Sequence, residues 1–502
     1  MSDREASAGS RPAAGLAREL GLMGLVATGI CAMLGAAINV MPFMIQRSVP
    51  GIGPWVLPAY LFAAVPAVLA ALAYASLGSA MPRAGGSYIY ASRALSPYWG
   101  FVASFSQWFG LSIAIGVVSY ILIPFLRDIA GALEWVALAG ALDTGAVRVG
   151  LALAFLWTFV LVNVRGLELY ERTLVPMMFL MFALGAVVIV AGFAFDHGDF
   201  TAALSASEGR SVPEVAAPAL EPRTLLAASV LLFATFIGFD SIAQAGGEAK
   251  NPGRNLPLAI GLAITIVGGF YFLFTAAVYH AVPWSFIAAE AQVRDLTAPG
   301  LLGYLLPAGW TVVIVGGAAV ALINDLPAML LAVSRMMFAW AEDGIFPKRA
   351  AAVHPRRRTP HIAIIASGVM ASVGITGSHL AGDFFLGIDI LVISMLVNFG
   401  LMCLALLTLP RRNPDLAARV SVLTGSTART LVGGAGVVVL GTFLVVQVTR
   451  DLTSEVAAWY FHPTWVWLLV MAVASGVYWR EMAALRTSGA DVERIFRELP
   501  PE

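Results

Sequence analysis

Two carboxylates stand inside long apolar segments, where a charged side chain is costly unless it pairs, faces water or has a function. Asp240 follows the glycine-containing stretch 236–239, and Asp325 follows Asn324 in a later apolar segment. Each carboxylate could hold a cation or take up a proton, and either event would remove net charge from its surroundings. Alternatively, Asp325 caps or pairs within a polar helix interface, for instance with Asn39 or Asn324. We expect Asp325 to bind the coupling ion, with Asp240 as the next candidate.

Two apolar segments that are long enough to span a bilayer are interrupted. The first is interrupted within 29–42, which contains Gly35 and Pro42, and the second, 231–257, contains a break at 237–239. In hydrocarbon, unwound backbone persists only where it lines protein or a wet cavity. The paired breaks therefore predict a binding site between them, near the middle of the membrane. A packing face of small residues is the alternative explanation.

The open ends of such broken helices have a defined chemistry. Free N–H groups at a helix N-terminus hold a carboxylate, and free carbonyls at a C-terminus hold an ammonium group or a metal cation. A site between two breaks therefore suits a zwitterion.

The composition is that of a polytopic membrane protein, because 59% of the 502 residues are hydrophobic and only 12% are charged. Net charge is zero, which gives no reason to expect nucleic acid as a partner. Cys31 and Cys403 are too few for a disulfide framework, and the six histidines show no metal-ligand spacing. No catalytic motif or phosphate loop is present. We expect neither an enzyme nor a cofactor, apart from a coupling proton or sodium ion.

Hydropathy over windows of about 20 residues predicts twelve helices. Most of the 30 basic residues then fall on one side, so the positive-inside rule puts both termini, 1–21 and 481–502, in the cytoplasm. We expect a multi-pass protein of the cell membrane, the inner or cytoplasmic one. The predicted helices are 22–45, 54–81, 98–126, 147–164, 173–195, 224–247, 257–282, 306–340, 361–378, 384–409, 430–449 and 464–480.

Four stretches form a recognisable set, namely GICAMLGAAINVMP at 29–42, MPRAGGSYIYASRALSPYWGFVASFSQW at 81–108, FIGFDSIAQAGGEAKNPGRNLP at 236–257 and SRMMFAWAEDGIFPKRAAAVHPRRRTP at 334–360. Together, in their order and spacing, they resemble the amino acid–polyamine–organocation (APC) superfamily of transporters. The resemblance implies an all-α fold of two inverted five-helix repeats, 22–195 and 224–409. Helices 1 and 6 would be broken, and two further helices would lie within 430–480.

The resemblance also implies individual roles. Gly35, Ala36 and Ala37 match the family's Gly-x-Gly, whose amides take the substrate carboxylate, although Ala37 replaces the second glycine. Asn39 replaces a frequent aromatic residue and makes the site more polar. By the same resemblance Asp325 faces the broken part of helix 1.

Further residues complete the predicted site. The helix-1 partners of a sodium ion near Asp325 would be the carbonyls of Cys31 and Leu34. At the second break we expect substrate contacts from Phe236, as a lid, and from Ile237 and Gly238. At the cytoplasmic end of helix 8 we expect a gate and anchor network that includes Arg335, Glu342 and Asp343.

These expectations together predict a secondary transporter, either a proton- or sodium-coupled importer or an exchanger, that carries an amino acid by alternating access. A carrier of an organic amine or polyamine is the alternative, because the carboxylate site is weakened and two buried carboxylates are present. A membrane sensor that does not transport is the third interpretation. The expected partners are the small-molecule substrate and the lipid bilayer, and the sequence leaves the oligomeric state open.

Overall fold

The computed structural model describes residues 16, 18–35, 37–294, 296–381, 385–456 and 458–500. Within these residues the regular elements are helices, and β-type pairing is limited to two isolated backbone bridges. Twelve spans are long and apolar enough to cross a membrane, which confirms the predicted all-α polytopic fold. The spans are α1 (Leu22–Met33) with α2 (Ala37–Ser48), α3 (Val56–Ala80), α5 (Pro97–Ala132), α7 (Gly145–Arg165), α8 (Leu167–Ala194), α10 (Pro222–Leu232) with α11 (Ser241–Gln244), α12 (Pro252–Ala281), α15 (Ala308–Glu342), α16 (His361–Ala381), α17 (Phe385–Arg412), α19 (Ser426–Leu452) and α20 (Pro463–Thr487).

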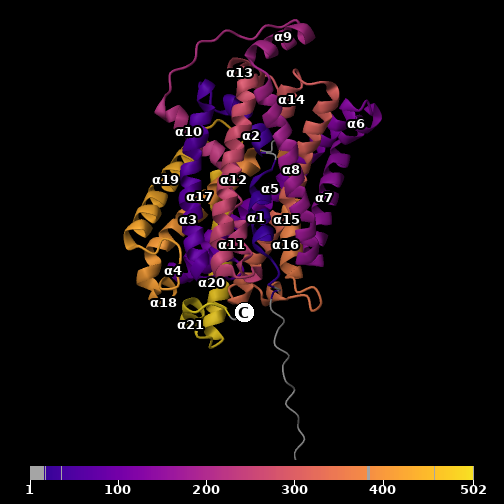
Figure 1. Ribbon diagram of the computed structural model, residues 1–502. Coiled ribbons are helices and arrows are strands. Elements are labelled where there is room, and N and C mark those ends of the chain that lie inside the picture. Colours follow the sequence, from indigo (N-terminus) through magenta and orange to yellow (C-terminus); the bar gives the residue numbers. More distant parts are fainter. Residues whose placement is uncertain are drawn as a thin grey trace, which may run out of the picture.

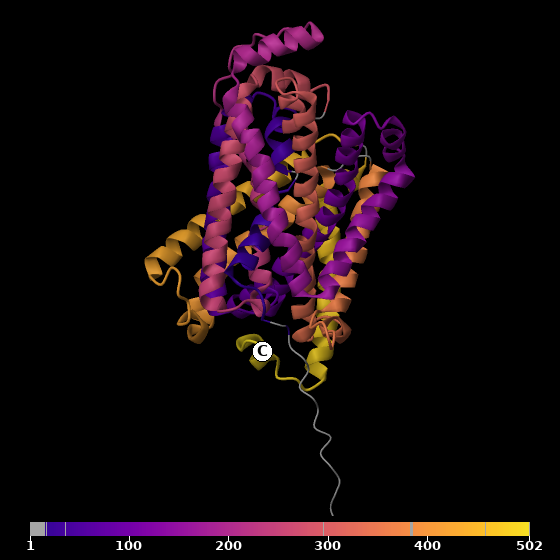
Figure 2. The ribbon, with the colours of Figure 1, turned by 45° about the vertical axis from the view of Figure 1, so that its right-hand side comes forward.

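Shorter helices mark the two ends of the bundle (Figures 1 and 2). We call the end that contains α9 the α9 end. The opposite end, which contains α21, is the α21 end. Residues 481–500, which belong to a terminus that we assigned to the cytoplasm, lie at the α21 end (Figure 1), and the cytoplasmic assignment itself stays a prediction. The α9 end holds α6 (Val136–Leu142), α9 (His197–Glu208), α13 (Trp284–Ala291) and α14 (Ala298–Leu302), and the α21 end holds α4 (Gly86–Ala94), α18 (Pro414–Ala417) and α21 (Val492–Arg497).

The two interrupted spans are largely buried inside the bundle, and α1, α2 and α11 lie near its middle in Figure 1. The most apolar part of the first span is 82% buried, and that of the α10–α11 span is 78% buried, against 22% for α7 and α20. The first break separates α1 from α2 after Met33, and the second follows the 3₁₀ turn Phe233–Phe236. Both predicted breaks are therefore present. The relation of the two five-helix halves as inverted repeats stays a prediction.

The two breaks touch each other. Gly238 adopts φ 138°, and a Cβ atom there would overlap the carbonyl of Ala32 near the end of α1. Asp240 Oδ1 accepts a hydrogen bond from the Gly238 amide at 3.1 Å, and the Tyr271 hydroxyl of α12 donates to the Met33 carbonyl. Backbone groups that the missing helical turns leave free are thus satisfied by neighbouring elements, as an apolar surrounding requires.

The α21 end is closed by backbone and ionic contacts. The Leu20 amide donates to the Glu248 carbonyl at 3.0 Å, and the Lys250 amide donates to the Leu20 carbonyl at 2.8 Å, which ties the start of α1 to the chain after α11. Arg335 forms two hydrogen bonds to Glu248, at 2.6 and 3.0 Å, and these side chains are 1% and 0% exposed. The pair therefore joins α15 to the second broken span.

Some predicted boundaries were wrong by several residues. Helix α5 continues to Ala132 instead of 126, and α8 begins at Leu167 instead of 173. In α8 the added turn contains Glu168, which pairs with Arg172 one turn later. A hydropathy window ends where polar residues begin, whereas the hydrogen bonds of the helix continue into the polar boundary of the membrane.

We predict that Gly238→Ala will destroy the contact between the breaks. A Cβ at φ 138° is strained and overlaps the Ala32 carbonyl, so α1 and α10 must move apart. Thermal unfolding of the purified protein should occur at a lower temperature. Gly261→Ala on α12, where a Cβ would meet nothing within 4 Å, should leave the unfolding temperature unchanged or slightly raised. Equal unfolding temperatures for the two variants would contradict the contact.

A second prediction concerns the buried ion pair. Glu248→Gln leaves the Arg335 guanidinium buried without its counter-charge, which should destabilise the protein by about 3–5 kcal/mol. The exposed Glu168–Arg172 pair provides the control, because Glu168→Gln should change stability by less than about 1 kcal/mol. Thermal or denaturant unfolding in detergent measures both effects. If Glu248→Gln proved as stable as the control, the pair would have no role in holding α15.

Candidate substrate site

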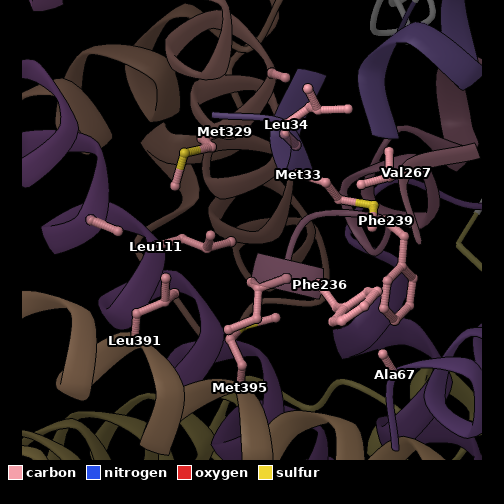
Figure 3. Close-up of a cluster of buried hydrophobic side chains, with 14 of the residues drawn as sticks. Met33, Leu34, Ala67, Leu111, Phe236, Phe239, Val267, Met329, Leu391 and Met395 are labelled. Carbon is pink, nitrogen blue, oxygen red and sulfur yellow. The ribbon is translucent and has the colours of Figure 1, made fainter. Parts of the chain in front are cut away.

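A cavity of about 110 Å³ lies between the two breaks, α5, α15 and α17. Figure 3 shows buried apolar side chains of this region, including Met33, Leu111, Met329 and Leu391, gathered from four helices. Among the described lining residues Asp325 carries the only polar side chain. The lining residues are Ala32, Met33, Gly35, Ala37, Val40, Met41, Leu111, Ala114, Val117, Val118, Ile121, Ala234, Ile237, Leu322, Asp325, Met329, Ile388 and Leu391.

Asp325 projects from α15 onto the first break. Its carboxylate lies so close to Gly35 that a Cβ atom at that position would overlap Oδ2. The residue is 6% exposed, and Oδ1 has no hydrogen-bond partner within the described part of the chain. Glycine at position 35 is therefore what allows a buried carboxylate to rest on the opened backbone.

The neighbouring Asn324 points elsewhere. Its Nδ2 donates to Cys31 Sγ at 2.8 Å, and Met181 Sδ lies 3.9 Å from the same nitrogen. In this structure the polar contact of Asn324 is therefore with Cys31 rather than with the Asp325 carboxylate. We predicted that the carbonyls of Cys31 and Leu34 bind a cation. These contacts do not test that role, which stays a prediction.

Asp240 belongs to a buried polar network and does not line the cavity. Its Oδ2 accepts a hydrogen bond from Gln107 Nε2, while Oδ1 holds the Gly238 amide. Gln107 Oε1 in turn accepts from Ser87 Oγ at 2.6 Å and from Asn398 Nδ2 at 3.1 Å. Both Asp240 oxygens thus have partners that shape the second break. Of the two carboxylates, Asp325 is the one that faces the cavity.

The predicted residues of the second break are distributed over three environments. Ile237 lines the cavity. Gly238 packs on the backbone of α1, and Phe236 lies beside Phe239 on the far side of the cluster from Leu111 (Figure 3). The Phe236 ring contacts Tyr60 and Tyr271, with centroid distances of 5.9 and 6.0 Å, and is 2% exposed. In this structure it is a packed core side chain, and its action as a lid stays a prediction.

The predicted residues of the first break are also divided. Gly35 and Ala37 line the cavity, whereas Ala36 lies outside the described residues. Asn39 and Leu34 instead face a smaller cavity of about 20 Å³ between α2, α8, α12 and α15. Asn39 is therefore directed away from the space that Asp325 faces.

The residues predicted to form the gate occupy separate places at the α21 end. Arg335 pairs with Glu248, Asp343 forms a bidentate pair with Arg93 at 2.5 and 3.0 Å, and Glu342 is exposed. Arg93 also donates to the Ile495 carbonyl at 3.0 Å, which fixes the C-terminal segment against α4. Two ion pairs thus hold this end of the bundle.

Sequence reasoning missed two groups of residues. The apolar lining from α5 and α17 has no signal in the sequence, because such residues are identical in type to those that face lipid. The network around Gln107 and Asn398 did have a signal, since polar side chains inside apolar spans usually face the bundle interior. Glu248 and Arg93 lay within recognised motifs, but only the structure identified their partners.

Comparison with known proteins places this chain in a family. The family model described as "Amino acid permease" matches residues 20–473. An uncharacterized transporter of Mycobacterium tuberculosis is 29% identical over 448 residues, which cover 88% of this chain and 93% of that protein. The branched-chain amino acid permease BcaP of Bacillus subtilis is 26% identical over 415 residues, covering 80% of this chain and 83% of BcaP.

A mammalian relative is longer. Cationic amino acid transporter 4 of Mus musculus is 28% identical over 377 residues, covering 71% of this chain, and the match spans 55% of the mouse protein. The family match extends from the start of α1 into α20 and includes both breaks and every helix that lines the cavity. The resemblance noted in the sequence is confirmed, and the chain belongs to the amino acid permease family of the APC superfamily.

Proposed function

We propose that this protein is a secondary active transporter that carries an amino acid with an apolar side chain across the cell membrane by alternating access. The observation that supports the proposal is the cavity between the two helix breaks, which combines an apolar lining with one carboxylate, Asp325. Aliphatic side chains such as Leu111, Val117 and Leu391 favour an aliphatic substrate side chain. The name of the relative BcaP refers to branched-chain amino acids, which have such side chains.

The ends of the cavity differ in how they are closed, which supports alternating access. Toward the C-terminal end of α2, a larger cavity of about 560 Å³ shares Met41 with the central one. Leu386 lines the larger cavity and Ile388 the central one, so both cavities border the first turn of α17. At the α21 end the two buried ion pairs must break before a substrate could leave. We propose that this end faces the cytoplasm, as the basic residues predict.

Coupling to a cation rests on Asp325. A buried carboxylate with an unpartnered oxygen gains stability from a sodium ion or a proton, and either one removes its charge. Binding of the ion and binding of the substrate would then be linked through this one carboxylate. We propose cation-coupled uptake, or exchange, on this basis.

An apolar amine is the second candidate substrate. The described cavity lining has one carboxylate and no basic side chain, so an ammonium group with an aliphatic tail would also fit. The two candidate substrates differ in one group. An amino acid must place its carboxylate at the first break, whereas an amine has no carboxylate.

We predict that proteoliposomes containing the protein will take up leucine, and that isoleucine and valine will compete while lysine will not. The side-chain ammonium group of lysine would have to enter an apolar cavity without a partner. This costs several kcal/mol and therefore at least about a hundredfold in affinity. Uptake of radiolabelled leucine with unlabelled competitors measures this. If isoamylamine, which is leucine without its carboxylate, competed as well as leucine itself, the amine candidate would replace the amino acid.

We further predict that Asp325→Asn will lose accumulation driven by an imposed pH or sodium gradient, while exchange of internal for external leucine continues at leucine concentrations high enough to offset weaker binding. The amide keeps the shape of the side chain but neither takes up a proton nor neutralises a sodium ion. Glu168→Gln, at an exposed position on α8, should accumulate leucine like the wild type. Gradient-driven accumulation in Asp325→Asn would remove the coupling role from this residue, and Asp240 would be tested next.

A further inference from the structure

We propose that, in the empty protein, the Asp325 carboxylate occupies the anion position at the N-terminal end of α2 that the carboxylate of the substrate takes when it binds. This inference rests on the proposed function, since it concerns the same cavity. It assigns to Asp325 a direct role in selecting substrates, separate from coupling.

The N-terminal end of α2 supplies the positive side of the cavity. This helix of 12 residues starts at Ala37, directly after the break, and Ala37 and Val40 of its first turn line the cavity. The first amides of a helix have no acceptor within the helix, and the helix dipole adds a partial positive charge there. No arginine or lysine is among the described lining residues, so an anion in this cavity has the helix end as its partner.

The Asp325 carboxylate already lies at this helix end. It rests on Gly35, two residues before α2 begins, at a distance that leaves no room for a Cβ atom. The side chain comes from α15, is 94% buried and has an Oδ1 without a hydrogen-bond partner in the described chain. An ionised group so far from water needs a positive partner, and the start of α2 is the one that the cavity offers.

A substrate carboxylate and the Asp325 carboxylate therefore compete for one position. Two like charges in contact repel each other strongly where the local dielectric constant is low. A zwitterion resolves the conflict, because its carboxylate can take the amides of α2 while its ammonium group binds Asp325, including the free Oδ1. The amino acid thus inserts between Asp325 and α2. A carboxylic acid without an ammonium group would leave Asp325 with no partner, so the cavity should reject it.

This mechanism predicts that removing the Asp325 carboxylate opens the anion position. Isothermal titration calorimetry on the purified full chain would use two probes, leucine and isocaproate, the analogue of leucine that lacks the amine. Wild-type protein should bind leucine and not isocaproate. Asp325→Ala and the isosteric Asp325→Asn should both gain isocaproate binding by at least about tenfold and lose leucine affinity by a similar factor. Glu168→Gln is the control and should bind both probes as the wild type does.

Two results would overturn the inference. One is isocaproate binding to folded Asp325→Asn and Asp325→Ala that is no tighter than to the wild type. The other is wild-type protein that binds isocaproate as tightly as leucine. Failure of the proposed function looks different, because the wild type would then bind no amino acid, while the gain of isocaproate binding in the variants would still support the anion position. Thermal unfolding of each variant verifies that it is folded.

Discussion

Backbone polar groups in a membrane must find partners inside the protein, and this requirement shapes the centre of the permease. Two helices are interrupted inside the membrane, where this requirement is hardest to meet. The structure satisfies it by bringing the openings together, with Gly238 against the Ala32 carbonyl, Tyr271 on the Met33 carbonyl and Asp240 on the Gly238 amide. The other central helices, α5, α15 and α17, surround this contact, and the cavity is the space that remains between them.

The two intramembrane carboxylates show how similar residues acquire different tasks. Asp240 is bound through both oxygens by Gln107 and Gly238, so its charge supports the conformation of the second break. Asp325 faces a cavity and keeps one oxygen without a hydrogen-bond partner in the described chain. A carboxylate whose acceptors are used is a structural element, whereas one with an acceptor left over can respond to a ligand or an ion.

The two ends of the bundle also differ in the contacts that hold them. The α21 end is held by Arg335–Glu248 and Arg93–Asp343, and both pairs connect α15 to other elements. On the opposite side, Met41 lines both the central cavity and the larger cavity of about 560 Å³. Because α15 contains Asp325 as well as Arg335 and ends beside Asp343, a movement of this one helix would affect the cavity and both ion pairs together.

The sequence by itself determined the number of spans, their approximate limits and the two breaks, because hydropathy, glycine and proline act locally along the chain. The family followed from four motifs in order. Tertiary structure alone decided which polar residue faces the cavity. Asp325 and Asn324 are adjacent in sequence, yet one reaches Gly35 and the other Cys31, because successive residues of a helix point about 100° apart. Asn39 likewise lines a different cavity from Asp325. Glu248 and Arg93 lie far along the chain from Arg335 and Asp343, the charged residues with which they pair.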